Sequence, residues 1–372
     1  MKTGISLYPD FMDAGTLRDY VRKASDLGCR RVFLSFILEV LNFAGAAGPE
    51  AAVFDEAIAA CHACAMQVTA DVNDRVMDAF GTPETAVAML KRRGLDFLRA
   101  DSELSDETLD TMGRAGMGIE INAADLDVSS ASGRAKAAAE VERLLAHLPV
   151  ALVRGCFNFY PRTGTGLSLA RVRDTAAFLH GYGLEAAAFV SSLSAPPVLH
   201  ARGRGVPTAE CLRDVPPEIA AAVLRLFGVD TVLFGDVSAT TAELRALAAA
   251  CGDGVLSLPV VYHRDCPEGV RRCLAETVLS NREDAPEYVL RCTATRGLQV
   301  DPFRTGPRPR FSVTVDNCRS AQYEGETQIM LRDMPACGET NVAGFIHPDA
   351  HILIPLLSGR DLRFRLVPYA GE

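Results

Sequence analysis

Short apolar runs alternate with amphipathic stretches of helical length through about the first 250 residues of the chain. Strands that are buried on both faces have continuous apolar sequences, and most of these runs have that character. Glycine often follows a helical stretch, as in Leu27-Gly28-Cys29, which is typical of a helix C-terminus. The pattern predicts eight strands, namely Thr3–Tyr8, Arg31–Phe36, Gln67–Val72, Phe97–Ala100, Gly118–Asn122, Ala151–Phe157, Glu185–Val190 and Thr231–Phe234.

Helices are predicted between these strands, among them Thr16–Leu27, Ala51–Met66, Pro83–Arg92, Ser132–His147, Ser168–Tyr182, Ala209–Phe227 and Thr241–Ala250. This number of strand–helix units, in a segment of this length, matches a (β/α)8 TIM barrel, an α/β fold. A doubly wound open sheet is the competing architecture. We disfavour it because Tyr8-Pro9-Asp10 follows the first strand, where that fold usually has a glycine-rich dinucleotide fingerprint.

The pattern changes near Cys251, so we expect a barrel over residues 1–250 and a second domain over residues 251–372. Pro259, Pro267 and Pro286 interrupt the sequence around one predicted helix, Pro267–Leu279. Short alternating runs separated by turn residues then predict a small, mainly-β domain. Its predicted strands are Tyr288–Ala294, Arg310–Val315, Gln328–Leu331, Asn341–Ile346, Ile352–Ile354 and Leu362–Leu366.

The composition narrows the class of protein. The chain has 372 residues, of which 48% are hydrophobic, and a formal net charge of −9. This acidic balance, with basic residues that are scattered, argues against nucleic acid or an anionic membrane as the partner. The N-terminus enters a predicted strand and has no signal-peptide pattern. No apolar run approaches the ~20 residues that span a bilayer, and we therefore expect a cytoplasmic protein.

The cysteine and histidine pattern gives little support to a metal site. Eleven cysteines are consistent with small buried side chains in a reducing compartment. Cys61-His62-Ala63-Cys64 has metal-like spacing, but no second Cys or His pair lies at a suitable distance. The predicted strand ends carry no His, which transition-metal enzymes on barrels usually use. We therefore predict no metal, although several carboxylates together could still hold Mg²⁺.

Carboxylates, amides and arginines stand at the predicted C-terminal ends of the strands, where a barrel gathers its catalytic groups. They are Asp71 and Asn73 at the third strand, Arg99 and Asp101 at the fourth, Glu120 and Asn122 at the fifth, and Asp236 after the eighth. Structural roles are open alternatives. Asp71 could cap the next segment, and Arg99 and Asp101 could form an ion pair at the barrel mouth.

The sixth strand leads into Asn158, Tyr160 and Arg162, followed by Thr163-Gly164-Thr165-Gly166 and a helix. An amide, a phenol and a guanidinium thus meet where a strand ends and a helix begins, which is typical of ligand sites on α/β folds. The loop also offers backbone N–H groups to a phosphate or carboxylate near a helix N-terminus. An ordinary hydroxyl-rich turn is the alternative interpretation.

Carboxylate pairs flanked by amides favour glycoside hydrolysis. One carboxyl group, kept protonated, donates to the leaving oxygen, and the other attacks the sugar or activates water. Amides and hydroxyls hold the sugar, and Tyr160 could stack on a ring or hydrogen-bond to it. The sequence leaves open which carboxylates pair and whether the configuration is retained.

Several of these motifs together resemble one known family. Ala70-Asp71-Val72-Asn73, Leu98-Arg99-Ala100-Asp101, Gly118-Ile119-Glu120-Ile121-Asn122-Ala123 and Asn158-Phe159-Tyr160-Pro161-Arg162 occur in its order, as does Asn281-Arg282-Glu283-Asp284 in the second domain. The chain is similar to the MupG-type 6-phospho-N-acetylmuramidases over nearly its whole length. The resemblance implies a TIM barrel followed by a cyclophilin-like β domain. It also implies a cytoplasmic enzyme of cell-wall recycling that needs no cofactor.

The resemblance also implies a substrate. The substrate is a phosphorylated disaccharide of 6-phospho-N-acetylmuramic acid and N-acetylglucosamine. Our first hypothesis is accordingly a glycosidase in which Asp71, Asp101, Glu120 and Asp236 are the candidates for the acid and its nucleophile or base. Asn73, Asn122, Asn158 and Tyr160 hold the sugar, and Arg99, Arg162 and Arg282 hold the phosphate or lactyl carboxylate. The segment at residues 278–294 departs from the family pattern, which bears on the exact substrate.

Two other functions use the same predicted barrel. A sugar-phosphate isomerase or aldolase would need a metal or a Schiff-base lysine, and Lys91 and Lys136 lie on predicted helices rather than at strand ends. A phosphosugar-binding protein without catalysis would bind the same ligand and recruit a partner through its second domain. The sequence does not indicate an oligomeric state.

Overall fold

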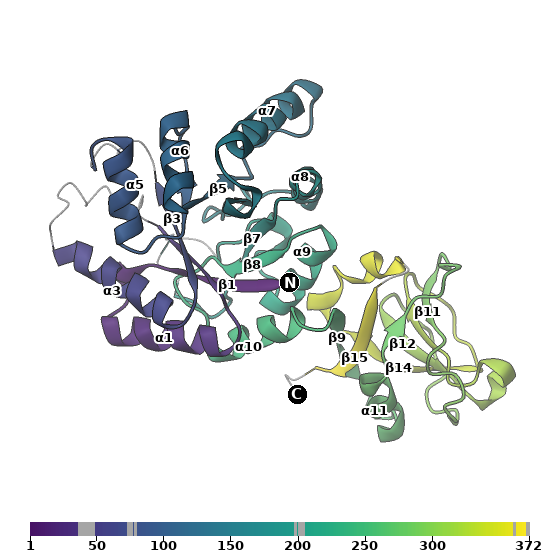
Figure 1. Cartoon of the computed structure of the whole chain (residues 1–372). Helices are drawn as coiled ribbons and strands as arrows, with labels where there is room; N and C mark the ends of the chain where they lie inside the picture. The colour runs from purple at the N-terminus through teal and green to yellow at the C-terminus, as the bar shows by residue number, and fades with distance from the viewer. Residues whose placement is uncertain are drawn as a thin grey trace. The chain divides into compact units, whose positions relative to one another are not determined.

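The structure is a computed structural model (Figure 1) that describes residues 1–35, 49–72, 77, 80–196, 199, 205–359 and 362–369. The chain divides into two compact units, Met1–Cys251 and Gly252–Glu372. Within the described part of the chain, no helix has both the length and the apolar character that a membrane crossing requires.

The first unit is a closed barrel of eight parallel strands, in which each strand pairs with the next and β1 pairs with β8. The predicted (β/α)8 barrel is confirmed, and the open doubly wound sheet is excluded. The strands are β1 (Lys2–Leu7), β2 (Arg31–Leu34), β3 (Gln67–Val72), β4 (Phe97–Ala100), β5 (Gly118–Asn122), β6 (Val153–Cys156), β7 (Ala186–Val190) and β8 (Thr231–Phe234).

Helices surround the ring of strands (Figure 1). Several begin at a Ser, Thr or Asp whose side chain accepts a hydrogen bond from a first-turn N–H group, such as Ser168 before α8, and this stabilises the helix start. The helices are α1 (Ala14–Asp26), α3 (Pro49–Ala63), α5 (Pro83–Arg92), α6 (Asp106–Ala115), α7 (Ala131–His147), α8 (Leu169–Gly181), α9 (Pro217–Leu226) and α10 (Thr241–Ala250).

Two barrel segments differ from the predicted elements, and proline explains both. Pro149 begins a short 3-10 helix, η2 (Val150–Leu152), so β6 starts later than expected. The predicted helix Ala209–Phe227 is divided into a short 3-10 helix, η3 (Glu210–Leu212), and α9. Pro216 precedes α9 and Pro217 is its first residue, so no helix continues through this point, because proline lacks an N–H donor and disfavours helix in the residue before it.

The register of the strands places four polar side chains at one level of the barrel. Asp71 is paired with Arg99, Arg99 with Glu120, and Glu120 with Arg154 across β3, β4, β5 and β6. Side chains alternate between the two faces of a strand, so these four residues share a face. Arg31 of β2 also contacts Glu120 of β5, which is not a neighbouring strand, so this shared face is the interior of the barrel.

Glu120 is the centre of an ion-pair cluster inside the barrel. One of its carboxylate oxygens, Oε2, accepts hydrogen bonds from Arg31 Nη2 and, at 2.9 Å, from Arg154 Nε. Arg154 also donates to the Thr69 hydroxyl at 2.6 Å and lies 3.5 Å from the centroid of the Phe97 ring. Burial raises the pKa of Glu120, but the charges of the arginines outweigh burial and hold this pKa below its usual value.

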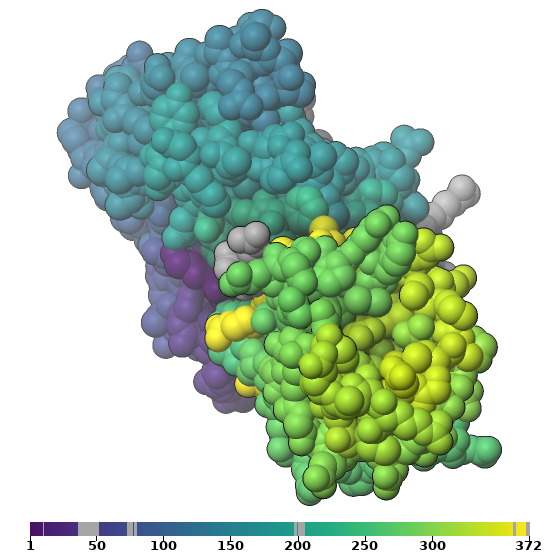
Figure 2. Space-filling model, turned by 90° about the vertical axis from the view of Figure 1, so that its right-hand side faces the viewer, coloured from purple at the N-terminus to yellow at the C-terminus, as the bar shows by residue number. Residues whose placement is uncertain are grey.

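The second unit is mainly β, as predicted. Its single seven-stranded sheet has the order β10-β15-β9-β14-β12-β13-β11, and its surface is coloured green to yellow in Figure 2. The elements are β9 (Val255–Tyr262), α11 (Glu268–Glu276), β10 (Leu279–Ser280), β11 (Val289–Cys292), β12 (Ser312–Asp316), β13 (Thr327–Met330), β14 (Thr340–Ile346) and β15 (Arg363–Pro368).

Three predictions for this unit were wrong. The predicted helix Pro267–Leu279 ends at Glu276, and Leu279 lies in β10. Pro259 lies within β9 instead of ending a segment, and its carbonyl accepts the His347 N–H group at 2.8 Å. The segment Ile352–Ile354 is not a strand, because a turn there leads into a 3-10 helix, η6 (Ile354–Ser358), with Pro355 in its first turn.

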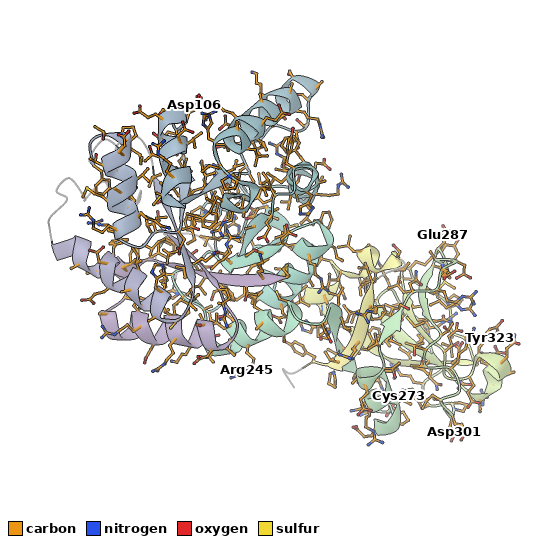
Figure 3. The ribbon with its side chains drawn as sticks, in the orientation of Figure 1. Asp106, Arg245, Cys273, Glu287, Asp301 and Tyr323 are labelled. Atoms are coloured by element: carbon orange, nitrogen blue, oxygen red, sulfur yellow. The ribbon has the colours of Figure 1, made fainter. Side chains whose placement is uncertain are left out.

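A buried acid also organises one end of the second unit. Glu326 is 1% exposed and forms ion pairs with Arg291 and Arg296. Both guanidinium groups lie over the ring of Tyr323, at 5.3 and 5.1 Å from its centroid. Tyr323 is labelled in Figure 3. Cation–π contacts with the Tyr323 ring therefore add to the ion pairs of Glu326 at this end of the unit.

We predict that Glu120→Gln destabilises the barrel by about 3–5 kcal/mol, because it leaves two buried guanidinium groups without their counter-charge. Chemical denaturation followed by circular dichroism measures this. Glu56→Gln, the same chemical change at an exposed carboxylate of α3, is the control. The stabilisation by Glu120 is present above the ordinary glutamate pKa and is lost as the pH falls through its lowered pKa. Equal stability of both variants would contradict this role.

Candidate active site

Two aspartates and a tyrosine lie at the C-terminal rim of the barrel. Asp71 lies in β3, Asp236 follows β8, and Tyr8 follows β1 between them in the ring. Burial raises the pKa of Tyr8, and the charges of Asp71 and Asp236 raise it further. The phenol therefore lies in the field of both carboxylates. Its hydroxyl donates to the Gly235 carbonyl at 2.9 Å, which fixes the ring beside Asp236.

Asp236 is held by the backbone that follows β7. Its Oδ2 accepts the Ser192 N–H group at 2.8 Å and the Val206 N–H group at 3.4 Å. Burial nevertheless raises the pKa of Asp236 to about 6, since the residue is 5% exposed. A carboxyl group with this pKa can carry a proton close to neutral pH, which general acid catalysis requires.

Asp71 has a different environment. It is 7% exposed, and the Ser35 hydroxyl donates to its Oδ2 at 2.7 Å. Asp71 lies at the C-terminal end of β3, in the row of residues that faces the barrel interior. Its catalytic role and the alternative that it caps the following segment both stay predictions.

Arg99 links two further predicted residues. Its Nη2 donates to Oδ1 of Asn158, and its Nε lies 3.4 Å from Oδ1 of Asp101. Burial raises the pKa of Asp101 although Arg99 opposes this effect, and Asp125 raises it again. The predicted ion pair of Arg99 and Asp101 is therefore present, together with an amide from the loop after β6.

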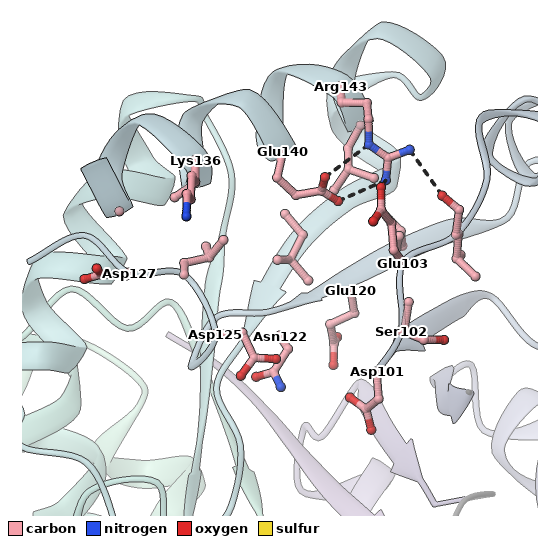
Figure 4. Close-up of a pocket in the computed structure, with 18 of the residues that line it drawn as sticks. Asp101, Ser102, Glu103, Glu120, Asn122, Asp125, Asp127, Lys136, Glu140 and Arg143 are labelled. Carbon is pink, nitrogen blue, oxygen red and sulfur yellow. Dashed lines mark hydrogen bonds and ion pairs between the residues drawn. The ribbon is translucent and has the colours of Figure 1, made fainter. Parts of the chain in front are cut away.

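Asn122 and Tyr160 lie in the same neighbourhood. Asn122 Oδ1 accepts the Ala124 N–H group at 3.2 Å and so caps the turn after β5. Burial raises the pKa of Tyr160, and the charge of Asp125 raises it further. Asp101, Glu120 and Asn122 also line one cavity of about 500 Å³ (Figure 4).

The small-residue loop after β6 does hold an anion, but that anion is part of the protein. The Gly164 and Gly166 N–H groups each donate to the Glu210 carboxylate at 2.8 Å. Arg213 forms a two-pronged pair with the same carboxylate, at 2.8 and 2.7 Å. Hydrogen bonds from Arg213 and these N–H groups lower the pKa of Glu210 to about 2. These two N–H groups are therefore engaged by Glu210.

Arg213 extends this contact to the backbone of the candidate site. It donates to the Tyr160 and Gly205 carbonyls, at 2.9 Å each. Glu243 has a similar role on the next loop: it caps α10 with Thr240 and accepts the Ser192 hydroxyl at 3.0 Å. Sequence reasoning missed Tyr8, Glu210, Arg213 and Glu243. Only Glu243 had a recognisable signal, the Thr240 to Glu243 capping-box spacing.

The structure does not bring every predicted residue to the rim. Glu120 lies in the ion-pair cluster described above and is 1% exposed. Arg162 is exposed on the loop after β6. Arg282 belongs to the second unit, where it pairs with Asp284 at 2.9 Å. Asn73 lies outside the described residues, so its role stays a prediction.

A closed parallel barrel with acids, amides and an arginine at the carboxyl ends of its strands belongs to the (β/α)8-barrel class of enzymes that act on small ligands at this rim. Residues 3–249 match the N-terminal part, and residues 256–367 the C-terminal part, of 6-phospho-N-acetylmuramidase. The chain therefore belongs to the MupG family of 6-phospho-N-acetylmuramidases, which are glycosidases, and the family implies a role in cell-wall recycling.

Solved structures show the same architecture. An uncharacterized Bacillus cereus protein is 25% identical, with a TM-score of 0.81, and the match covers 98% of this chain and 99% of that one. A conserved Enterococcus faecalis protein of unknown function is 23% identical, with a TM-score of 0.74, over 100% of this chain and 97% of that one. Among curated proteins, none matches the sequence significantly.

We predict that Glu210→Gln lowers kcat/KM on the family's phosphomuramyl substrate by about a hundredfold, because small displacements of positioning groups have effects of this size. A neutral amide has only one acceptor oxygen for the two glycine N–H groups and Arg213. Steady-state kinetics, run well below the unfolding temperature of each variant, measure the effect. Glu56→Gln on the exposed face of α3 is the matched control, and equal kcat/KM in both variants would contradict the prediction.

Proposed function

We propose that this enzyme hydrolyses the glycosidic bond between 6-phospho-N-acetylmuramic acid and N-acetylglucosamine. Family membership supports a phosphomuramyl substrate. The observation that carries the proposed chemistry is the rim pair around Tyr8: Asp236, whose pKa is raised to about 6, and Asp71, whose charge acts on the same phenol. Carboxyl groups in two different environments are what glycoside hydrolysis needs.

In this mechanism Asp236 donates its proton to the glycosidic oxygen as the bond to the anomeric carbon breaks, so the leaving sugar departs as an alcohol. Asp71 either attacks the anomeric carbon or removes a proton from an attacking water. In the first case Asp236, now ionised, activates the water that releases the sugar. Asp101, the other partly buried rim carboxylate, is the alternative partner of Asp236.

The remaining predicted residues have binding roles in this proposal. Asn158, Asn122 and Tyr160 donate and accept hydrogen bonds with sugar hydroxyls. Asn73, which lies outside the described residues, keeps the same predicted role. Arg99 orients Asn158 and Asp101. Arg162, whose side chain is exposed, binds the phosphate or lactyl carboxylate. The substrate-binding role of Arg282, in the second unit, stays a prediction from the sequence. Glu120 is engaged by two arginines with a lowered pKa, so we propose that it positions the rim instead of donating a proton.

The direct test is incubation of the purified chain with the phosphorylated disaccharide and measurement of the free N-acetylglucosamine that is released. NMR of the first product formed identifies its anomer, and therefore whether the configuration is retained. Release of sugar from the phosphorylated disaccharide but not from its unphosphorylated form is expected. A protein that binds the disaccharide without cleaving it would overturn the proposal.

The raised pKa of Asp236 predicts an alkaline limb in the pH profile. Because the acid must be protonated, kcat/KM falls tenfold per pH unit as the pH rises above about 6. Asp236→Asn lowers kcat on the disaccharide by about 10²–10⁴-fold and removes this limb. A limb that persists unchanged in the variant would assign the acid to another group.

A substrate with an activated leaving group separates the two carboxylates. A nitrophenyl glycoside of the phosphosugar needs little help from an acid, so we expect Asp236→Asn to regain most of its activity on it. Asp71→Asn, which lacks the second carboxylate, stays slow on both substrates. Asp101→Asn tests the alternative partner, and Asp174→Asn on the exposed face of α8 is the control.

A further inference from the structure

Three phenylalanine rings pack together towards the C-terminal end of the barrel interior. Phe33 of β2 and Phe189 of β7 are buried, and their ring centroids lie 5.5 Å apart in an edge-to-face arrangement. Since β2 and β7 are not neighbours in the ring of strands, these two side chains can meet only inside the barrel. Phe159, which follows β6, packs against both, and its centroid lies 6.1 Å from that of Phe33 and 5.3 Å from that of Phe189.

The Phe159 ring lies across the barrel mouth. β8 and β1 separate β7 from β2 in the ring of strands, so a side chain that contacts both Phe33 and Phe189 extends over the barrel interior and not along its wall. The Phe159 side chain is partly exposed, although the two rings beneath it are buried. Because these rings cover its inner side, the exposed part of the Phe159 ring faces out of the mouth.

The backbone on both sides of Phe159 is fixed by the segment that follows β7. The Asn158 carbonyl accepts the Thr208 hydroxyl at 2.9 Å, and the Tyr160 N–H group donates to the Pro207 carbonyl at 3.0 Å. The same Thr208 hydroxyl accepts an N–H group of β7 at 2.9 Å. The ring is therefore held in place by hydrogen bonds as well as by packing, which is the preorganisation that a binding surface needs.

The two carboxylates of the proposed mechanism lie nearer the rim than the rings that Phe159 contacts. On one side, the Ser35 hydroxyl, two residues beyond the ring in β2, donates to Asp71 at 2.7 Å. On the other side, the Ser192 N–H group, three residues beyond the ring in β7, donates to Asp236 at 2.8 Å. A sugar that reaches both carboxylates therefore has the Phe159 ring on the side of the barrel interior.

An aromatic ring determines which face of a sugar can lie on it. A hydroxyl group pressed against the ring would lose its hydrogen bonds to water without replacement, whereas C–H groups pack well against an aromatic face. A phosphate is repelled by the negative charge on that face. A pyranose on the Phe159 ring thus places its C–H groups inward and turns its hydroxyls and its phosphate towards the polar groups of the rim.

We propose that Phe159 is a substrate-binding residue, whose ring packs against the C–H face of the sugar that carries the reacting anomeric carbon. This inference rests on the proposed function, in which that sugar is 6-phospho-N-acetylmuramic acid. The ring supports the sugar from the interior side and so sets its depth relative to Asp71 and Asp236. A side chain that only completes the barrel core is the alternative, and it predicts no effect of the ring on sugar affinity.

A fluorescent reporter tests this contact without turnover. The chain contains no tryptophan, so Phe159→Trp introduces a single indole at the proposed binding surface. Titration with N-acetylmuramic acid 6-phosphate, a product of the proposed reaction, should shift the emission to shorter wavelength and saturate, because the sugar displaces water from the indole. Tyr182→Trp is the matched control. Tyr182 is also partly exposed and packs edge-to-face on a ring 5.3 Å away, but it follows α8 at the opposite end of the barrel, so its emission should not change.

Phe159→Leu removes the ring and keeps an apolar side chain. We expect the dissociation constant of the same sugar, measured by calorimetry, to rise about tenfold, which is the size of effect that the loss of an aromatic contact produces. Tyr182→Leu should leave this constant as it is in the parent chain. Circular dichroism at the titration temperature verifies that each variant is folded.

Three results would each overturn the inference: no binding of the sugar to the parent chain, an unchanged dissociation constant in folded Phe159→Leu, or constant emission of Phe159→Trp while calorimetry records saturable binding. Hydrolysis of the disaccharide by the parent chain is measured separately. Cleavage together with an unchanged constant in Phe159→Leu rejects only the role of the ring. Weaker binding in Phe159→Leu without cleavage by the parent chain rejects the proposed hydrolysis and leaves a phosphosugar site that contains Phe159.

Discussion

The pairing of Glu120 with Arg31 and Arg154 determines what the barrel interior can contain. It joins β2, β5 and β6 across the ring, and it places a carboxylate where aliphatic side chains usually pack in such barrels. A buried charge is tolerated only if it is paired and hydrogen-bonded. The cluster can therefore form only when the ring of strands is closed. In the closed ring, Arg99 of β4 is the register partner of Glu120 and contacts Asn158 and Asp101 at the rim.

The sequence was sufficient to predict most of the barrel. The predicted bounds of β3, β4, β5 and β8 agree with the structure, because buried parallel strands are short apolar runs between recognisable helix ends. The period of two along a strand also placed Arg99 with Asp101, and Glu120 with Asn122, on shared faces. Pro259 shows the limit of such reasoning, since a proline is compatible with a strand wherever its missing N–H group is not needed.

The site was less predictable, since its geometry depends on contacts between segments far apart in the chain. Nothing near Glu120 in the sequence indicates that Arg31, at the start of β2, reaches it. Likewise, Glu210 lies 44 positions after Gly166. The sequence of the loop around Gly164 and Gly166 is typical of phosphate sites, and it does not indicate that a carboxylate of the same chain binds these N–H groups. Local motifs therefore identified which residue types are present, but not which of them already have partners.

The Glu210 contact has a thermodynamic consequence for substrate recognition. A tethered carboxylate keeps the loop that carries Asn158 and Tyr160 in one conformation before any sugar arrives, so the conformational entropy of ordering that loop belongs to folding and not to association. This preorganisation favours rapid, lock-and-key binding over loop closure. In the proposed function the exposed Arg162 contributes to phosphate binding, and the strength of such an exposed ion pair depends on ionic conditions.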